Sequence, residues 1–294
     1  MVQRCTYRNR EVQGSGFPVI QRLLPLRVRA AARSLSRLWN ENRPLLWRIL
    51  ECVQRSSLVE VLACLEDGGG EGASTFTIRL ISRKAPLTLR RGSSDFAVFR
   101  QVILEDQYNL PEISDPEYIV DAGANIGLSS VVFLERYPRC QVVAIEPDPQ
   151  NYEIATKNLE CYGERCRVLP IALWSSSGTV AVQRGNFRDG LDWSCQTVAV
   201  CEPEQTTVNA STMTALLLNA GFPRIDFLKV DIEGAELQVF GEGDTSFLER
   251  TQCCATECHD SLRVDVYCQT MSRYGFSIRH EGELVIAWRE TARR

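Results

Sequence analysis

The chain has 294 residues, of which 44% are hydrophobic and 24% are charged, and its formal net charge is −4. These values are ordinary for a soluble globular protein and suit one large α/β domain, or such a domain with an extension. Residues 1–50 hold ten arginines against two acidic residues, so the rest of the chain is acidic and gives no reason to expect a nucleic acid as the main partner.

Residues 1–72 are predicted to form an arginine-rich helical extension, with one helix at residues 52–66 and a glycine-rich linker at residues 67–72. Apolar residues are interspersed with arginines over residues 20–50, as expected for helices that pack on a domain. An interfacial membrane helix and an organelle transit segment are the alternatives, so peripheral membrane contact through residues 20–50 stays open. No stretch reaches the roughly 18 apolar residues that a membrane span requires.

Residues 73–116 are predicted to form a shoulder that precedes the main domain. Residues 75–81 and 85–90 alternate between apolar and polar side chains, as the strands of a hairpin do. A helix is expected over residues 97–105, with Ser94 or Asp95 as its N-cap. The main domain is then expected to cover residues 117–294.

The most informative stretch begins at residue 117. A short apolar strand, residues 118–120, leads to Asp121, and glycines follow at positions 123 and 127 before a helix-like segment at residues 128–136. Gly123 lets the chain turn and lets backbone approach a ligand because it has no Cβ atom. Gly127 would allow a helix to pack closely on a strand. This strand–turn–helix pattern predicts the start of a nucleotide-binding fold.

Glu146 ends the next predicted strand, residues 141–146. In a βαβ unit, an acidic residue about 20 positions after the first turn binds a ribose. The two ribose hydroxyls donate hydrogen bonds, and an ionised carboxylate accepts them. The alternative is that Glu146 only caps the following helix, a role for which Asp148 is the better candidate.

The remaining elements alternate between helices and strands, which predicts a parallel sheet with helices on both faces and a ligand site beyond the carboxyl ends of its strands. In chain order we expect a helix at residues 149–161, strands at 167–172, 178–184 and 196–200, a helix at 211–219, a strand at 224–231, a helix at 235–240, a strand at 252–257, a helix at 262–274, and an antiparallel pair of strands at 276–279 and 284–289.

A second group of charged residues surrounds the predicted strand 224–231. Lys229 and Asp231 are two residues apart, so they share a face of the strand and can form an ion pair. Glu233 and Glu236 are three apart and would share a face of the next helix. These residues form either a functional site at the strand end or a structural ion-pair cluster.

His259 follows the predicted strand at residues 252–257 and is one of only two histidines. The ordinary pKa of histidine, near 6.5, suits removal of a hydroxyl proton at neutral pH. An oxygen-rich metal site formed by Asp231, Glu257 and His259 is the less favoured alternative.

The twelve cysteines are scattered, without a C-x-x-C pair or a hydrophobic signal sequence. This pattern predicts a reduced, intracellular protein with a cytoplasmic location. A zinc site formed by Cys253, Cys254, Cys258 and His259 is disfavoured because adjacent residues of a strand point to opposite faces. No metal site is therefore predicted.

Together these motifs resemble the FkbM family of methyltransferases. The turn at residues 121–127, D-x-G-x-N-x-G, is similar to the first motif of Rossmann-like methyltransferases that use S-adenosylmethionine. The resemblance covers residues 75–290 and not residues 1–70. At residues 211–214 the sequence departs from the Thr-Leu-Asp run usual in the family, and we expect a helix cap or a supporting contact to be lost there. Further matching pieces, in the same order, are residues 91–95 with Phe99, 144–148, Asn158, 226–236 and 257–259.

The resemblance implies a Rossmann-like methyltransferase fold, with a mostly parallel seven-stranded sheet, helices on both faces and an antiparallel edge hairpin. It implies S-adenosyl-L-methionine as the cofactor and a hydroxyl on a sugar or secondary metabolite as the methyl acceptor. Asp231 or His259 would remove the acceptor proton, with Lys229 and Glu233 as orienting residues. The residues expected to bind the cofactor are Asp121, Gly123, Ala124, Asn125 and Gly127 for its methionine part, Glu146 for its ribose, and Ala172 and Leu173 for its adenine.

Two other classes of protein stay open. A non-catalytic cofactor-binding or scaffold protein would keep Glu146 but transfer no methyl group. An NAD-dependent oxidoreductase needs a glycine-rich turn that admits a pyrophosphate, which Asn125 does not favour.

Overall fold

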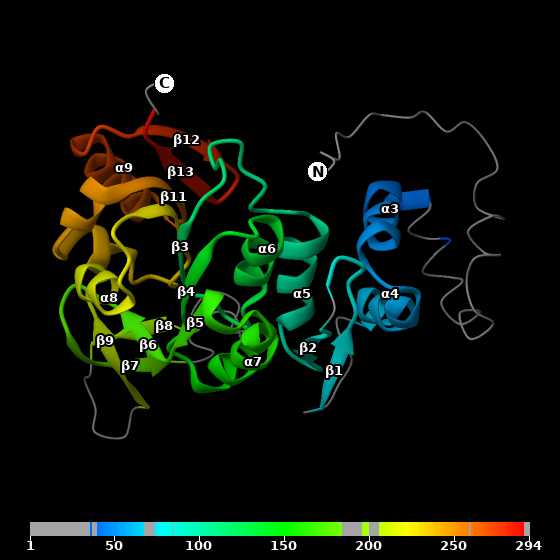
Figure 1. The fold of residues 1–294 in the computed structure, drawn as a ribbon. Coiled ribbons are helices and arrows are strands. Elements are labelled where there is room, and N and C mark those ends of the chain that lie inside the picture. Colours follow the sequence, from blue (N-terminus) through cyan, green and yellow to red (C-terminus); the bar gives the residue numbers. More distant parts are fainter. Residues whose placement is uncertain are drawn as a thin grey trace.

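A seven-stranded sheet forms the centre of the fold in this computed structural model, which describes residues 36, 40–67, 74–83, 85–183, 196–199, 206–258 and 260–290 (Figure 1). Five neighbouring strands of the sheet are parallel to one another, and the two remaining strands form an antiparallel hairpin at one edge. This arrangement confirms the predicted mostly parallel sheet with an antiparallel edge pair. The strands in spatial order are β12 (Ser277–Glu281), β13 (Leu284–Trp288), β11 (Thr251–Glu257), β10 (Ile225–Val230), β3 (Tyr118–Ala122), β4 (Gln141–Ile145) and β5 (Cys166–Leu169).

Helices cover both faces of this sheet, because successive strand residues point to opposite sides. Ile119 belongs to the core on one face, while its neighbour Val120 belongs to the core on the other. The Ile119 face is covered by α6 (Leu128–Arg136) and α7 (Pro149–Leu159), and the Val120 face by α8 (Met213–Ala220) and α9 (Ser261–Arg273). Short 3-10 segments lie at Arg55–Ser57, Glu160–Arg165 and Ser246–Arg250.

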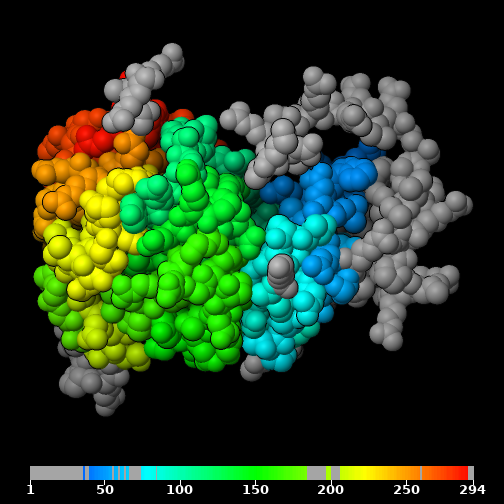
Figure 2. Space-filling model, in the orientation of Figure 1, coloured from blue at the N-terminus to red at the C-terminus, as the bar shows by residue number. Residues whose placement is uncertain are grey.

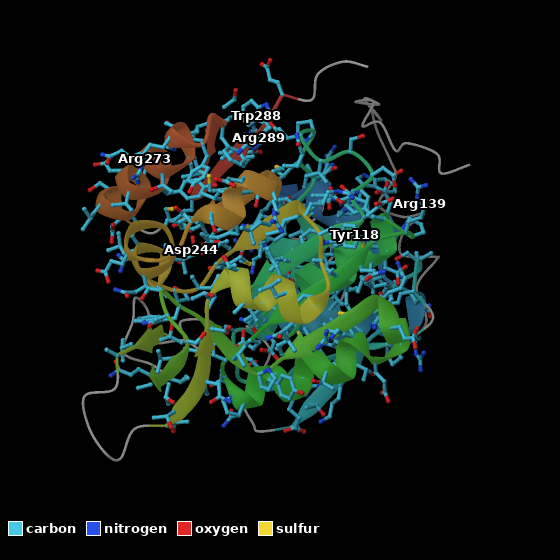
Figure 3. All side chains as sticks on the ribbon, turned by 60° about the vertical axis from the view of Figure 1, so that its left-hand side comes forward. Tyr118, Arg139, Asp244, Arg273, Trp288 and Arg289 are labelled. Atoms are coloured by element: carbon cyan, nitrogen blue, oxygen red, sulfur yellow. The ribbon has the colours of Figure 1, made fainter. Side chains whose placement is uncertain are left out.

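The register between β3 and β10 is held at their amino ends. The Asp226 carboxylate accepts hydrogen bonds from the backbone N–H groups of Glu117 and Tyr118, at 2.8 and 2.9 Å. The Tyr118 ring, labelled in Figure 3, lies under the Arg224 guanidinium, with 5.0 Å from the guanidinium carbon to the ring centroid. This register places Lys229 of β10 directly beside Asp121 of β3.

A second, four-stranded sheet has the order β6-β9-β7-β8, formed by β6 (Ile171–Leu173), β9 (Thr207–Ser211), β7 (Gly178–Gln183) and β8 (Gln196–Val198). The prediction of one strand over residues 167–172 was wrong: the chain leaves the central sheet after Leu169 and enters the second sheet at Ile171. Pro170 separates the two because proline has no N–H to continue a ladder. Strand β9 was not predicted.

Helix α8 keeps its N-terminal cap. The Thr212 side chain accepts a hydrogen bond from the backbone N–H of Ala215, at 3.2 Å. The expectation that the departure at residues 211–214 removes a cap was therefore wrong, because threonine caps a helix nearly as well as aspartate does.

The shoulder consists of an antiparallel hairpin, β1 (Thr75–Ile78) and β2 (Leu87–Arg90), and a short helix, α5 (Asp95–Phe99), that continues as a π-helical turn over Arg100–Leu104. The hairpin is as predicted, but the prediction that Ser94 or Asp95 caps the helix was wrong. Ser94 makes no capping hydrogen bond, and the buried Asp95 carboxylate binds the Arg90 guanidinium at 2.6 Å instead. On the face shown in Figure 2, the cyan shoulder packs directly against the green segment.

Two helices precede the shoulder, α3 (Arg43–Cys52) and α4 (Leu58–Asp67), so the helix expected at residues 52–66 begins later than predicted. Ile49 and Val61 are fully buried in the same core as the shoulder and α6. Within the part of the chain that the structure describes, no helix is both long and apolar enough to cross a bilayer. Of the stretch at residues 20–50, only Ser36 and residues 40–50 are described.

Candidate active site

The glycine turn after β3 brings three strand ends together. Gly123 has a φ of +77°, and a Cβ atom built on it would lie 1.7 Å from the carbonyl oxygen of Asp231. The N–H groups of Gly123 and Ala124 both donate to the carbonyl oxygen of Ile145, each at 2.9 Å. Only glycine permits this approach, so position 123 fixes the ends of β3, β4 and β10 at one point.

Gly127 also has a positive φ, +83°, and begins helix α6. A Cβ atom there would lie 2.9 Å from the Leu159 side chain and 3.3 Å from the Cα atom of Ala155. We expected Gly127 to let a helix pack closely on a strand. The close contact is instead with helix α7, so the predicted partner was wrong.

Glu146 follows β4 and is 4% exposed. Its Oε2 accepts a hydrogen bond from the backbone N–H of Asn125 at 2.7 Å, and its Oε1 accepts from the N–H of Asp148 at 3.0 Å. Burial raises the pKa of this carboxyl to about 7, and the N–H donors oppose the rise. Helix α7 is capped by Asp148, which accepts from the N–H groups of Gln150 and Asn151 at 2.9 Å each. The capping alternative for Glu146 is therefore unnecessary.

Lys229 lies at the centre of a buried ion cluster. Its Nζ donates to the carbonyl oxygen of Gly123 at 2.5 Å and lies 3.3 Å from Asp121 Oδ1 and 3.6 Å from Asp231 Oδ2. Burial alone would lower the pKa of Lys229, but the neighbouring acidic groups, Asp121 foremost, outweigh it and raise the pKa. The predicted pair with Asp231 forms, and Asp121 is the nearer carboxylate.

Asp121 is fully buried behind the wall of the site. Its Oδ2 accepts hydrogen bonds from the hydroxyls of Ser129 and Ser130, at 2.5 and 2.7 Å. Together with the ion pair to Lys229, these contacts show that Asp121 fixes the lysine and helix α6 in place.

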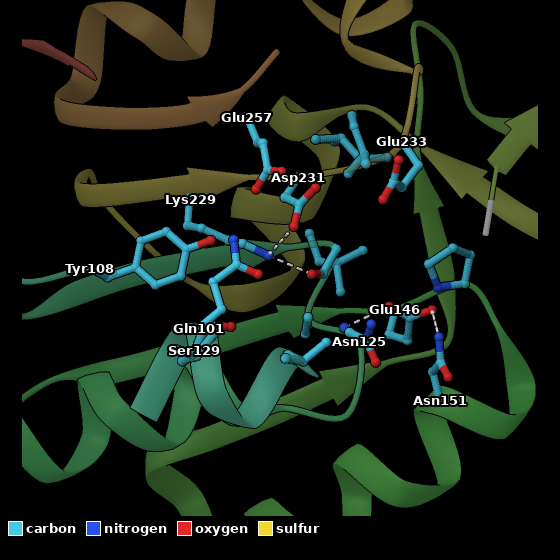
Figure 4. A pocket seen from close by; sticks show the side chains of 18 of the residues that line it. Gln101, Tyr108, Asn125, Ser129, Glu146, Asn151, Lys229, Asp231, Glu233 and Glu257 are labelled. Atoms are coloured by element: carbon cyan, nitrogen blue, oxygen red, sulfur yellow. Dashed lines mark hydrogen bonds and ion pairs between the residues drawn. The ribbon is translucent and has the colours of Figure 1, made fainter. Parts of the chain in front are cut away.

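A cavity of about 380 Å³ opens beyond the carboxyl ends of β3, β4, β10 and β11 (Figure 4). It brings together most of the predicted residues. Neither Asp121 nor Gly127 lines it, and His259 lies outside the described residues. The predicted residues that line it are Gly123, Ala124, Asn125, Glu146, Ala172, Leu173, Lys229, Asp231 and Glu233.

Ala172 and Leu173 reach this cavity from the second sheet. They were expected at the end of the third central strand, but they lie on β6, which pairs with β9. Both are buried apolar side chains and form one wall of the cavity.

The predicted helix 235–240 forms from residue 236 onward: the N–H of Val239 donates to the carbonyl oxygen of Ala235 at 3.1 Å, and the helix continues as a π-helical segment at Gln238–Glu242. Glu233, however, lies in the turn before this helix, with a φ of +51°. Glu236 holds this turn, because its carboxylate accepts from the N–H groups of Ile232 and Gly234 at 3.2 and 2.9 Å. Glu233 and Glu236 therefore do not share a helix face: Glu233 lines the cavity and Glu236 does not.

Sequence reasoning missed the part of the cavity supplied by the shoulder. Gln101, Gln107 and Tyr108 line the cavity, and Tyr108 is 2% exposed. The Tyr108 ring meets Phe133 edge-on at 5.8 Å, and its carbonyl oxygen accepts from the Arg136 guanidinium at 2.9 Å. No local pattern marks these residues, because only long-range packing brings them to the strand ends. Glu283, in the β12–β13 turn, was missed for the same reason.

The described residues include no group of three or more histidine, cysteine, aspartate or glutamate side chains arranged to hold a metal ion. Cys253 and Cys254 belong to the cores on opposite faces of the sheet, as strand alternation requires. Burial raises the pKa of the Cys254 thiol to about 11, so this side chain is a thiol at neutral pH.

Comparison with known proteins identifies the family. A family model described as "Methyltransferase FkbM domain" matches residues 121–278, more than half of the chain. Methyltransferase sdnD of Sordaria araneosa is 27% identical over 174 residues, which cover 48% of this chain and 66% of that protein. The 2-O-methyltransferase NoeI of Sinorhizobium fredii is 25% identical over 186 residues, which cover 58% of this chain and 73% of NoeI.

Among solved structures, a methyltransferase from Geobacter sulfurreducens matches with a TM-score of 0.38 and 17% sequence identity, over 69% of this chain and 92% of that one. The chain spans just under two thirds of the length of sdnD and of Methyltransferase 1 of Beauveria bassiana. With its mostly parallel seven-stranded sheet and the family match over residues 121–278, the chain belongs to the FkbM family of methyltransferases and has a Rossmann-like methyltransferase fold.

Proposed function

We propose that this protein transfers a methyl group from S-adenosyl-L-methionine to a hydroxyl group of a small molecule or glycan. The observation that carries this proposal is Glu146, a buried carboxylate that faces the cavity at the end of β4 beside the glycine turn. Each of its oxygens has two lone pairs, so both can accept ribose hydroxyls in addition to their present N–H donors.

Asn125 supports the fit of the cofactor to this cavity. Its Oδ1 atom is buried and has no hydrogen-bond partner among the described residues. A buried acceptor without a donor is unfavourable by about 1–3 kcal/mol. A donor group of a bound ligand, such as the ammonium of a methionine moiety, would satisfy it.

Other residues that line the same cavity would make the remaining contacts with the cofactor. Gly123, Ala124 and Asn125 would hold the methionine part, and Ala172 and Leu173 would border the adenine. Asp121 and Gly127 act indirectly, through Lys229 and through the start of helix α6. When bound, the cofactor supplies a methyl group on a positively charged sulfur, so the protein's main task is to align the acceptor oxygen and remove its proton.

Asp231 is the first candidate for the group that takes the acceptor proton. Its carboxylate lines the cavity beside Lys229, which holds it in place. Glu233 lies on the same rim and would orient the acceptor. His259 is the second candidate base, because it follows the end of β11 in the sequence.

The names of two relatives favour an oxygen atom and a sugar, respectively, as the methyl acceptor. NoeI is a 2-O-methyltransferase, and a hexuronic acid methyltransferase, AglP of Haloferax volcanii, is 24% identical over 187 residues. In this proposal residues 117–294 form the cofactor-binding domain, and residues 73–116 contribute contacts to the acceptor. We also propose that the protein acts in the cytoplasm.

Transfer of a radiolabelled methyl group to a panel of hydroxylated compounds tests the proposal. Asp231→Asn is expected to lower kcat by on the order of 100-fold or more without weakening cofactor binding. Asp115→Asn, an exposed carboxylate paired with Arg139, is the matched control and should leave kcat unchanged. Normal turnover in both Asp231→Asn and His259→Ala would contradict the base assignment. Cofactor binding without transfer to any acceptor would favour the non-catalytic alternative.

A further inference from the structure

The cavity has two ends, which we name after the ligands proposed for them. The acceptor half lies at the Lys229 end and comprises the side chains of Gln101, Tyr108, Asp231, Glu257 and Glu283. The cofactor half lies at the opposite end, around Asn125 and Glu146 (Figure 4). Asn151, from the first turn of helix α7, lines the cavity beside Glu146.

The side-chain amide of Asn151 is held from two sides. Its Oδ1 accepts a hydrogen bond from the Arg90 guanidinium at 2.7 Å, and its Nδ2 lies 3.5 Å from Glu146 Oε1. A guanidinium carries only donors and an ionised carboxylate only acceptors, so a reversed amide would set donors against donors and acceptors against acceptors. Arg90 therefore fixes the orientation in which the NH2 group of Asn151 is directed to Glu146.

Arg90 is the last residue of strand β2 in the shoulder, and the Asp95 carboxylate holds it in place. The Nε and Nη2 atoms of Arg90 donate to the two oxygens of this carboxylate at 3.0 and 2.6 Å, and its backbone N–H donates to Oδ2 at 2.8 Å. Asp95 is fully buried. The guanidinium is thus fixed in the position from which Nη2 also reaches Asn151.

A second asparagine docks the same strand on helix α7. The buried Asn158 accepts from the N–H of Thr88 at 2.7 Å, and its Nδ2 donates to the carbonyl oxygens of Thr88 and Ile126 at 3.0 and 2.9 Å. Ile126 belongs to the glycine turn after β3. Strand β2, helix α7 and this turn are therefore held together independently of the contact between Arg90 and Asn151.

The Asn151 NH2 group complements the Glu146 carboxylate as a partner for a hydroxyl. A hydroxyl both donates and accepts hydrogen bonds, so one that donates to Glu146 still has lone pairs that need a donor. Asn151 directs its N–H groups to the same place. The distance of 3.5 Å to Glu146 is at the outer limit of a hydrogen bond, so little is lost when one N–H group binds a ligand oxygen instead.

We propose, on the basis of the cofactor named in the proposed function, that Asn151 donates a hydrogen bond to a ribose hydroxyl of the cofactor that itself donates to Glu146. Arg90 is the positioning residue that holds the Asn151 amide for this contact. Arg90 precedes the family match over residues 121–278, so the shoulder supports the cofactor half from outside the matched domain.

Calorimetric titration with S-adenosylhomocysteine and its 2′-deoxy and 3′-deoxy analogues tests the Asn151 contact. Asn151→Ala should weaken binding of S-adenosylhomocysteine by about threefold to tenfold, as expected for one hydrogen bond. For the analogue that lacks the contacted hydroxyl, the loss should shrink to less than about twofold. An equal loss for all three ligands, or no loss, would overturn the contact. Gln150→Ala removes an exposed amide from the same helical turn and should leave all three affinities unchanged.

Arg90→Lys tests the positioning role. Lysine keeps the charge that pairs with Asp95, but its ammonium lacks the planar fork that binds Asp95 and Asn151 together. We expect S-adenosylhomocysteine to bind about twofold to fivefold more weakly. Because Arg90 acts through Asn151, the double variant should bind no more weakly than Asn151→Ala alone, and additive losses would overturn the positioning role. Arg91→Lys is the matched control, since Arg91 pairs with Glu60 and does not line the cavity.

Urea denaturation of each variant separates binding from folding. We expect Arg90→Lys to stay folded, because Asn158 docks the strand independently; the three-ligand series with Asn151→Ala decides the contact without it. Failure of the proposed cofactor reads differently, since wild type would then bind no S-adenosylhomocysteine. Binding by wild type that is weakened in Glu146→Ala but unchanged in Asn151→Ala would overturn this inference alone.

Discussion

The two halves of the cavity are built in different ways. The cofactor half comes from one βαβ unit, in which Asn125 and Glu146 meet through a 2.7 Å hydrogen bond to backbone. The acceptor half draws on segments that are far apart in the chain, from Gln101 in the shoulder to Glu283 near the carboxyl end. The first half is fixed mainly by backbone geometry, and the second by side chains that long-range packing places together.

This difference means that the two halves should respond separately to substitution, except where they share a support. Gly123 and Lys229 are the shared supports. Gly123 has no side chain, so the backbone at the end of β10 can lie against the turn after β3. Lys229 forms ion pairs with Asp121, which does not line the cavity, and with Asp231, which does. Substitutions at these two positions should damage both halves, whereas substitutions at Glu146 or Tyr108 should damage only one.

The largest effect is expected from Gly123→Ala. The new Cβ atom would lie 1.7 Å from the Asp231 carbonyl oxygen at a φ of +77°, and this oxygen belongs to backbone that cannot shift without breaking strand pairing. We expect a loss of more than about 4 kcal/mol in the free energy of unfolding, measured by urea denaturation.

Gly163→Ala is the matched control for that substitution. Gly163 also has a positive φ, +56°, but a Cβ atom there would meet nothing within 4 Å. The free energy of unfolding should fall by about 1–3 kcal/mol, from backbone strain alone. Equal losses at both positions would mean that the close approach at Gly123 does not hold the strand ends.

Lys229→Met should have the next largest effect. It leaves the buried Asp121 carboxylate without its cation, which typically lowers stability by about 3–5 kcal/mol. Lys157→Met removes an exposed pair with Glu153 and should lower the stability by less than about 1 kcal/mol. Denaturation of the two variants in parallel checks the difference, and a loss at Lys229 as small as at Lys157 would contradict a structural ion cluster.

Substitution of Glu146 should affect only the cofactor half of the cavity. The Glu146 carboxyl should also make the free energy of unfolding depend on pH. Its pKa of about 7 in the folded chain exceeds the value of about 4.3 expected for an unfolded chain. Between these pKa values the folded state keeps a proton that the unfolded state has lost. The free energy of unfolding therefore falls as the pH rises to about 7, by on the order of 4 kcal/mol in total. Above pH 7 the contribution is level.

Urea denaturation of wild type and Glu146→Gln over about pH 5 to 8 measures this contribution, because other groups cancel in the difference. The stability of wild type relative to the variant should fall as the pH rises and then level off. A difference that does not change with pH, or that grows with pH, would contradict the raised pKa. Cofactor affinity should rise over the same range, because the ionised carboxylate is the acceptor for ribose hydroxyls.

The smallest effect is expected from Arg136→Met, which acts on the acceptor half alone. Arg136 binds the carbonyl oxygen of Tyr108 and the carboxylate of Asp106, and thereby holds the loop that carries the Tyr108 ring. We expect KM for the acceptor to rise several-fold, consistent with loss of hydrogen bonds of about 0.5–1.5 kcal/mol, with cofactor affinity unchanged. Steady-state kinetics for both substrates separate the two effects, and a change in cofactor affinity alone would contradict the assignment.

The same difference explains how much of the site could be predicted. Asn125 and Glu146 follow consecutive strands of a βαβ unit, so a local pattern is enough to place them at one edge of the sheet. Tyr108 and Glu283 carry no such pattern, because a tyrosine in a loop and a glutamate in a turn are ordinary surface residues until packing brings them to the cavity.

Local sequence patterns also predicted only part of the fold. The alternation of strands and helices predicted the central sheet and its edge hairpin, but Pro170 divided one expected strand between two sheets, and β9 lacks the long apolar run of a central strand. The left-handed conformation of Glu233 was also outside the reach of pattern reasoning, because glutamate rarely adopts it.

Calorimetric titration with S-adenosylmethionine and S-adenosylhomocysteine, with NADH as a control, tests the central claim most directly. Wild type should bind both methyl-donor ligands and not NADH. Glu146→Ala should weaken that binding by about tenfold to a hundredfold, as expected for the loss of hydrogen bonds to a charged group, while Glu153→Ala, an exposed residue of α7, should leave it unchanged. Binding of NADH, or equal affinity in wild type and Glu146→Ala, would contradict the account.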